Sequence, residues 1–358
     1  MPLHRRGANR AAPDDNLQQQ RFGHGKILSL SLSLSLLALM LGTAPCPASA
    51  AEHNIRFAHD GAPDAVYSQT FRKFGELASA HSGGKVAVKM YESAVLGGDR
   101  EVTESAQRGD LQMGGCGTSN LGIFWPSAMA FDLPFIIDPA KKEALYRELN
   151  EGELGRYMNE QLAKVNLMAL VYADCPNRHY MTNKRPIPDL PSLKGVKMRT
   201  TASPVDNMLA ETLKMIPAPM GFAEIYTALQ QGTIDGELLS LADYYTSRRG
   251  DVLHYTLPTS HSFTCMVGVI SKSYWDSLPS DVQAALRKAA SEACAFGQEL
   301  VDRMDADGLK YSEQNRMTIH PFPAETRAAF LEAVKPVYDS FVPQIDPTFY
   351  SLLTATQK

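Results

Sequence analysis

Two arginines are the clearest candidates for a chemical role in this sequence. Arg178 and Arg199 lie 21 positions apart, and each stands beside a short apolar run that predicts a strand, around Met181 for the first and over residues 196–198 for the second. A guanidinium presents a planar fork of N–H donors that matches both oxygens of a carboxylate. If the fold brings both forks to one cleft, the sequence predicts a receptor for an organic acid; otherwise both are ordinary surface arginines.

The segment 114–122 supplies a candidate nucleophile. Ser119 follows an apolar strand in a near match to G-x-S-x-G, but the last glycine comes one position late, at Gly122. A nucleophile turn needs its small residues at fixed offsets, and no aspartate and histidine stand out downstream as partners. The segment therefore predicts a cleft loop in which Thr118, Ser119 and Asn120 offer polar contacts, or a plain polar turn.

Other catalytic patterns are missing from the sequence. It contains no H-E-x-x-H, no Walker or G-x-G-x-x-G glycine loop, and no C-x-x-C pair. We therefore expect a protein that is not an enzyme and that has no metal and no other cofactor.

Strand and helix patterns alternate along the first part of the chain. Strands are predicted over residues 55–59, 86–91 and 111–115, with helices over 65–81 and 99–109. This alternation predicts a parallel sheet wrapped by helices, whose ligands bind beyond the carboxyl ends of the strands. Apolar spacing of three and four from residue 281 to about 313 predicts one helix of about 30 residues, roughly 45 Å long. The end of the chain is expected to form a tail.

The first 50 residues are typical of an export signal. Five basic residues precede an apolar run over residues 27–41, and Ala48-Ser-Ala50 matches a cleavage site. The run is too short to span a bilayer comfortably. Removing residues 1–50 takes away five basic and two acidic residues, so the formal net charge changes from −4 to −7. Nucleic acid and anionic membrane surfaces are therefore unexpected partners.

Four cysteines remain once Cys46 is removed with the signal. Cys116, Cys175, Cys265 and Cys294 show no metal-ligand spacing. We expect small buried thiols; an exporting compartment also permits a Cys116–Cys265 or Cys175–Cys265 bridge.

Several segments, in order, resemble the solute-binding subunit of TRAP transporters (tripartite ATP-independent periplasmic transporters) of the C4-dicarboxylate-binding type. Residues 178–187 are similar to the family's R-x-x-x-T-N…R-P-I segment, and residues 193–199 to its L-K-G-x-K-x-R. Its best-known stretch is matched by residues 222–236, and Leu96-Gly-Gly-Asp-Arg-Glu and Asp132-Leu-Pro-Phe also fit. The resemblance covers about residues 53–345.

The resemblance implies a two-domain α/β periplasmic binding protein fold. We expect mixed sheets wrapped by helices, a cleft between the domains, and the long helix spanning both. Residues 52–175 plus 263–300 would form domain I, and residues 176–262 plus 301–350 domain II. Three chain crossings, near Cys175, near Ser262 and within the helix of residues 281–313, would act as hinges for closure on a ligand.

The resemblance also implies a binding site. Arg199 would anchor the carboxylate and Arg178 would contact a second polar group, while Phe222 stacks against the ligand. Leu239 stands where the family often has an asparagine, and Tyr245 follows closely. With Thr118, Ser119 and Asn120, these residues form the predicted site. Because Leu238 and Leu239 replace polar choices, we expect a carboxylate with a modest apolar or aromatic body rather than a heavily hydroxylated sugar acid.

The function implied is that of a periplasmic receptor. It would bind a small organic acid, deliver it to the membrane permease subunits of a TRAP transporter, remain free of the membrane after signal removal, and act as a monomer. Two alternatives remain open from the sequence: a ligand-sensing partner of a signalling receptor, and a periplasmic hydrolase acting on an organic acid.

Overall fold

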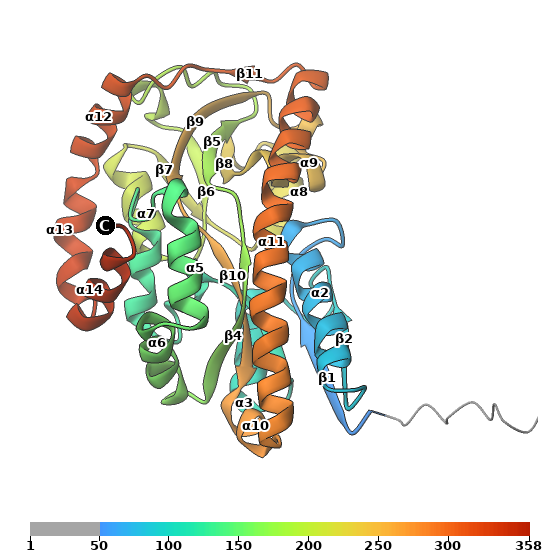
Figure 1. The fold of residues 1–358 in the computed structure, drawn as a ribbon. Helices are drawn as coiled ribbons and strands as arrows, with labels where there is room; N and C mark the ends of the chain where they lie inside the picture. The colour runs from blue at the N-terminus through green and yellow to red at the C-terminus, as the bar shows by residue number, and fades with distance from the viewer. Residues whose placement is uncertain (1–50) are drawn as a thin grey trace, which may run out of the picture. The chain divides into compact units, whose positions relative to one another are not determined.

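The computed structural model describes residues 51–358, so the predicted export signal lies outside the described residues. Residues 51–358 belong to one compact unit that contains two β-sheets. Figure 1 shows both sheets with helices packed around them. The mixed α/β architecture and the long helix are confirmed, whereas the predicted domain boundaries stay a prediction.

The first sheet has five strands in the order β2-β1-β3-β10-β4. Strand β1 is parallel to β2 and β3, while β10 runs antiparallel to both β3 and β4. Every residue of β4 and β10 is buried, as expected for apolar strands covered on both faces. The strands are β1 His53–Ala58, β2 Val86–Tyr91, β3 Met113–Gly117, β4 Leu167–Asp174 and β10 Cys265–Ser271.

The second sheet has six strands in the order β11-β9-β5-β8-β6-β7. Strand β5 is antiparallel to its neighbours β8 and β9, while β6 is parallel to β7 and β8. The strands are β5 Arg178–Thr182, β6 Lys197–Thr200, β7 Ile216–Pro219, β8 Gly236–Leu239, β9 Tyr255–Ser262 and β11 Thr318–Ile319.

The chain passes directly between the sheets at two places. Strand β4 of the first sheet ends at Asp174 and β5 of the second begins at Arg178, while β9 ends at Ser262 and β10 begins at Cys265. The predicted crossings near Cys175 and Ser262 are therefore confirmed.

Helix α11, Ser280–Gln314, is the predicted long helix. It packs against α2, Val66–His81, beside the first sheet and against α9, Leu241–Thr246, beside the second (Figure 1). A Cβ atom on Gly297 would collide with Thr70 of α2, and one on Gly308 with the backbone of Leu241. These two glycines therefore allow one helix to lie close to both parts of the structure.

The remaining helices pack around the two sheets (Figure 1). They are α3 Asp99–Arg108, α4 Thr118–Leu121, α5 Lys142–Asn150, α6 Glu153–Ala163, α7 Pro204–Thr212, α8 Ile225–Gln231, α10 Lys272–Ser277, α12 Ala324–Ala333 and α13 Lys335–Phe341. Among residues 51–358, no helix combines the length and apolar character needed to cross a membrane.

The expected C-terminal tail is wrong. Residues Pro347–Ala355 form helix α14, which begins with an Asp346 side chain that accepts hydrogen bonds from the backbone N–H groups of Thr348 and Phe349. Phe349 is fully buried, with its ring centroid 4.5 Å from that of Trp125. The burial of Phe349 and Leu353 therefore ties the end of the chain to the core.

The four cysteines of the described range are free and buried. The expectation of small buried thiols is confirmed, and the alternative Cys116–Cys265 and Cys175–Cys265 bridges are not formed. Burial also raises the pKa of Cys116, Cys175 and Cys265 well above the ordinary value, so these thiols stay protonated.

Candidate functional site

A cavity of about 580 Å³ lies between the two sheets, a volume within the usual range for small-molecule sites. One wall comes from segments that follow strands of the first sheet, and the other from strand ends and loops of the second. Its polar lining includes Asp60, Tyr67, Asp99, Ser119, Asn120, Arg178, Arg199, Thr201 and Asp243, and its apolar lining includes Met220, Phe222, Leu238, Leu239 and Met266.

Arg199 enters the cavity from strand β6. Its Nε and Nη2 donate to the carbonyl oxygen of Met220 at 3.1 and 2.9 Å, and the residue is 8% exposed. These bonds fix one side of the guanidinium against the backbone that leads into Phe222. The other N–H groups of this guanidinium make no hydrogen bond to the described residues.

Arg178 enters from the start of strand β5, beside the first crossing. Its Nε donates to the hydroxyl oxygen of Ser262 at 3.1 Å, Nη2 donates to the same oxygen, and the residue is also 8% exposed. The two predicted arginines therefore come together in one cavity although they lie on different strands.

Both guanidiniums are buried without a carboxylate partner. The two ion pairs with nearly buried side chains in residues 51–358 are Lys142–Asp174 and Arg249–Glu237, and neither includes Arg178 or Arg199. Burial lowers the pKa of Arg199, an effect that nearby Glu237 opposes. No carboxylate of the described residues lies within ion-pair distance of either guanidinium, so both remain open to a direct ion pair with a ligand carboxylate.

Two aspartates stand on the wall contributed by the first sheet. Asp60 follows strand β1 and accepts a hydrogen bond from the Tyr67 hydroxyl at 3.1 Å. Asp99 begins helix α3, and its Oδ2 accepts from the Gly117 N–H at 2.8 Å and from Asn120 Nδ2 at 2.9 Å. Burial and the neighbouring Asp99 raise the pKa of Asp60 to about 8.

A buried ion pair lies next to Phe222 in the apolar part of the cavity lining. Arg249 Nε lies 3.0 Å from Glu237 Oε1, and the Arg249 guanidinium lies 5.4 Å from the ring centroid of Phe222. Phe222, the predicted stacking residue, therefore contacts this ion pair and also lines the cavity.

Two of the predicted site residues do not line the cavity. Thr118 is buried, with its hydroxyl oxygen 3.4 Å from the backbone nitrogen of Cys265. Tyr245 packs on Tyr311 at 5.4 Å between ring centroids. Neither belongs to the lining, which does include Arg178, Arg199, Phe222, Ser119, Asn120 and Leu239.

Ser119 and Asn120 line the cavity and also form hydrogen bonds within the protein. The Ser119 hydroxyl donates to buried Asp132 at 2.7 Å, and Asp132 also accepts from Ser203 at the start of α7. Asn120 donates to Asp99. Ser119 is therefore hydrogen-bonded to a buried carboxylate rather than to a histidine base, unlike an activated nucleophile.

Sequence reasoning missed Asp60, Asp99 and Asp243 as cavity residues. A signal existed for the first two, since Asp60 comes directly after the first strand and Asp99 follows a glycine pair at the start of a helix. Asp243 lies in α9, where its Oδ2 accepts from the Ser240 hydroxyl at 2.8 Å, and no local pattern marked it.

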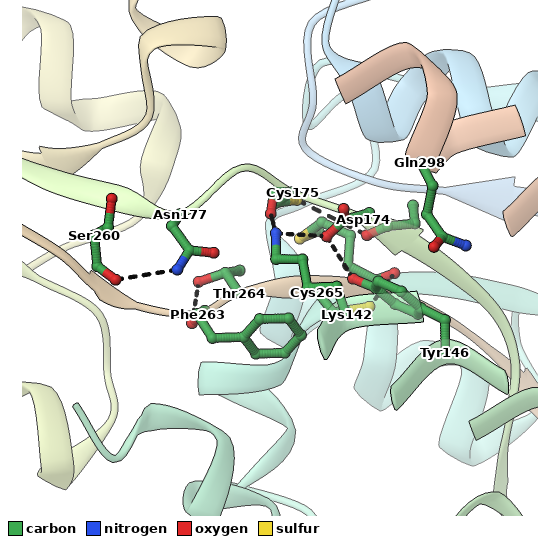
Figure 2. A network of polar contacts seen from close by, with 12 residues as sticks. Lys142, Tyr146, Asp174, Cys175, Asn177, Ser260, Phe263, Thr264, Cys265 and Gln298 are labelled. Carbon is green, nitrogen blue, oxygen red and sulfur yellow. Dashed lines mark hydrogen bonds and ion pairs between the residues drawn. The ribbon is translucent and has the colours of Figure 1, made fainter. Parts of the chain in front are cut away.

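A network of polar contacts supports the crossings behind the cavity. Lys142 Nζ lies 3.0 Å from Asp174 Oδ1 and donates to the carbonyl oxygen of Cys175 at 2.7 Å, while the Tyr146 hydroxyl donates to the same aspartate at 2.7 Å. Figure 2 shows Lys142, Tyr146 and Asp174 pointing toward one another beside the crossing segments. Lys142 also lies over the Phe263 ring of the second crossing, 5.7 Å from its centroid.

A cavity between two sheets, with buried cationic groups facing inward and short crossings behind it, defines a solute-binding protein of the cleft type. Residues 57–344 match the family described as bacterial extracellular solute-binding protein, family 7 (DctP). The chain belongs to this family, so it is a solute-binding transport receptor rather than an enzyme, and the TRAP resemblance is confirmed.

Relatives and solved structures agree with this assignment. The C4-dicarboxylate-binding periplasmic protein DctP of Rhodobacter capsulatus is 30% identical over 304 residues, which cover 84% of this chain and 89% of that protein. The sugar acid binding protein DctPAm of Advenella mimigardefordensis, in complex with galactonate, is 27% identical with a TM-score of 0.79, covering 85% of this chain and 97% of that one. A TRAP solute-binding protein of Sulfurospirillum deleyianum with bound succinate is 27% identical with a TM-score of 0.77, covering 86% and 99%.

Proposed function

We propose that this protein binds a small organic acid in the cavity between its sheets and delivers it to the membrane permease subunits of a TRAP transporter. Arg199 holds the ligand carboxylate through both oxygens, and Arg178 contacts a second polar group. Residues 1–50 act as an export signal that directs the protein to the periplasm, and the mature protein works there as a monomer.

The observation that carries this proposal is the pair of buried guanidiniums that share a cavity and lack a carboxylate partner. Desolvated charges are normally paired, because each costs several kcal/mol when it is left alone. A ligand carboxylate supplies the missing charge. Bidentate geometry suits this role, since one side of each guanidinium is already fixed by Met220 or Ser262.

The other lining residues shape the ligand body. Phe222, held by Arg249, offers a flat face for stacking, and Leu239 offers an apolar contact. Ser119 and Asn120 mark the opposite wall. The ligands named for similar proteins, C4-dicarboxylates, galactonate and succinate, all carry a carboxylate, the group that we assign to the arginines.

Ligand binding is proposed to close the cavity by rotation about the crossings. The predicted domains, residues 52–175 plus 263–300 and residues 176–262 plus 301–350, would move as bodies. A ligand that contacts both walls shifts the population toward the closed form.

A thermal-shift screen tests the proposed function. Mono- and dicarboxylates, keto acids and sugar acids are added to the purified protein, and at least one acid should raise its melting temperature and be recovered chemically unchanged. A screen in which uncharged analogues stabilise the protein as well as the acids would contradict carboxylate recognition. The mass of the exported protein should place its new N-terminus at Ala51.

A further inference from the structure

The rear pocket, a second cavity of about 370 Å³, is lined by residues of α5, of the first crossing, of β9 and of α11. Its volume is within the usual range for small-molecule sites. The first crossing separates it from the cavity between the sheets. Asp174 and Asn177 line the rear pocket, whereas Cys175 and Arg178 of the same segment line the other cavity. The two cavities therefore share a wall but differ in their lining residues.

The rear pocket carries an excess of negative charge. The charged side chains of its lining are one lysine and four carboxylates, namely Lys142, Glu143, Asp174, Asp302 and Asp305. Lys142 forms an ion pair with Asp174, and the other three carboxylates take part in no ion pair within residues 51–358. His179, the histidine of the lining, is neutral near pH 7 because burial lowers its pKa to about 4. The pocket therefore favours a cation.

Two acceptor atoms of the first crossing lack a hydrogen-bond donor. Asp174 is 3% exposed; its Oδ1 accepts from Lys142 and Tyr146, but its Oδ2 forms no hydrogen bond with the described residues. Asn177 donates through Nδ2 to the carbonyl oxygen of Ser260 at 3.1 Å (Figure 2), while its buried Oδ1 has no partner in the described part of the chain. Because a buried acceptor without a donor is costly, this end of the pocket suits a ligand group that donates.

Asp305 on α11 is placed to hold a positive charge. It is partly buried, and its Oδ1 accepts from the Ala242 N–H at 3.2 Å. Burial and repulsion by Asp243 and Asp174 raise the pKa of Asp305 to about 6, although the Ala242 N–H and Lys142 oppose the shift. A cation bound beside Asp305 would relieve this repulsion. Asp302 lies one turn earlier on the same helix and lines the same pocket.

The arrangement suits an organic cation better than a metal ion. Within residues 51–358, no group of three or more His, Cys, Asp and Glu side chains is arranged to hold a metal. A calcium ion takes about six to eight oxygen ligands around one point. Here the carboxylates of α11 and the unpartnered acceptors of the first crossing stand on separate elements around one cavity. A ligand with a donor at each end can reach both.

We propose that the rear pocket binds a small organic cation whose ammonium group pairs with Asp302 and Asp305 and whose far end donates to Asn177. This second ligand site goes beyond the proposed function, and acid recognition does not depend on it. Because the first crossing forms a wall of both cavities, a ligand in the rear pocket contacts a segment about which closure is proposed.

A matched four-carbon series tests the proposal on the wild-type protein. Titration calorimetry compares 1,4-diaminobutane, 4-amino-1-butanol, butylamine and 1,4-butanediol at about 0.1 M salt, which screens long-range attraction to surface charges. The diamine and the amino alcohol should bind roughly tenfold or more tightly than butylamine, which lacks the second donor, and the diol should not bind. Calcium and magnesium chloride form the metal arm. The proposal is overturned if no amine binds, or if a metal ion binds more tightly than every amine.

A double variant places the amine in the rear pocket. Asp302→Asn combined with Asp305→Asn removes both charges of α11, while the side-chain oxygen at position 305 still accepts from Ala242. Affinity for 1,4-diaminobutane should fall by roughly tenfold or more. Glu299→Gln is the matched control, because Glu299 is exposed on the same helix and lies outside the lining; it should bind the diamine like the wild type.

The same measurements separate this inference from the proposed function. A folded double variant that binds the diamine as tightly as the wild type overturns the inference, because the amine is then held elsewhere, for example by carboxyl groups of the cavity between the sheets. A wild-type protein that binds an acid from the thermal-shift screen but no amine also refutes it, and leaves the proposed function standing.

Discussion

Arg178 and Ser262 lie 84 residues apart in the chain and pair directly across strands β5 and β9, where the arginine donates to the serine hydroxyl at 3.1 Å. Each residue stands at a crossing between the sheets, because β5 begins at Arg178 and β9 ends at Ser262. Arg178, which lines the cavity, therefore lies at one crossing and forms a hydrogen bond to the other. Closure is proposed to occur about these two crossings.

Replacing Arg178 should weaken binding less than replacing Arg199. Loss of one hydrogen bond to a charged group costs about 1.5–3 kcal/mol, so Arg178→Ala should reduce affinity by roughly 10- to 150-fold. Ser262→Ala should cause a smaller loss, since the arginine remains but is less well positioned. Calorimetry with the best acid from the screen measures both, and an Arg178→Ala protein with unchanged affinity would remove Arg178 from the site.

Lys142→Met should destabilise the fold. The variant leaves Asp174 buried with only the Tyr146 hydroxyl to satisfy it, and breaking a buried pair typically costs about 3–5 kcal/mol. Lys272→Met is the matched control, because the Lys272–Asp276 pair is more exposed and joins neighbouring turns of one helix, where pairs contribute about 0–1 kcal/mol. Urea unfolding compares the two, and equal losses would show that the crossing network adds no special stability.

The ligand-free protein should lose stability relative to Asp60→Asn as pH rises from about 5 to about 8. The folded-state pKa of Asp60 is raised to about 8 by burial and by Asp99, partly offset by Tyr67 and Arg199. A raised carboxyl pKa gives stability that is fully present below the unfolded value, near 4, and is lost as pH rises through the folded value.

Unfolding free energies of both proteins at several pH values check this expectation. The pKa of His59 is lowered to about 4 by burial and by Arg72, which costs stability in acid. That histidine is present in both proteins, so its effect is removed by comparing them. Parallel curves would show that Asp60 is ionised throughout the range.

Ligand should make the molecule more compact. If an acid bridges the two cavity walls, small-angle scattering at saturating ligand should give a smaller radius of gyration than the ligand-free protein. Arg199→Ala with the same acid serves as the control and should show no change. An identical wild-type profile with and without ligand would mean that binding does not require closure.

Much of the fold follows from local pattern, but the full site does not. The long helix was predictable because its apolar spacing persists over many turns, and the arginines because each stands beside a strand. The placement of Asp60 and Asp99 in one wall of the cavity was not predictable, because these residues come together only when β1 and β3 pair as neighbours. Helix α14 was missed because its buried face depends on Trp125, more than 200 residues earlier.

The central claim is that Arg199 anchors the ligand carboxylate, and titration calorimetry of Arg199→Ala tests it most directly. Truncating one partner of a buried charged pair costs about 2–5 kcal/mol, so affinity for the best acid should fall by roughly 30- to several-thousand-fold. Arg199→Lys should also lose heavily, because an ammonium cannot reproduce the fork, whereas exposed Arg156→Ala should bind like the wild type. A folded Arg199→Ala protein that binds within about threefold of wild type would contradict the account, because the carboxylate would then be anchored elsewhere.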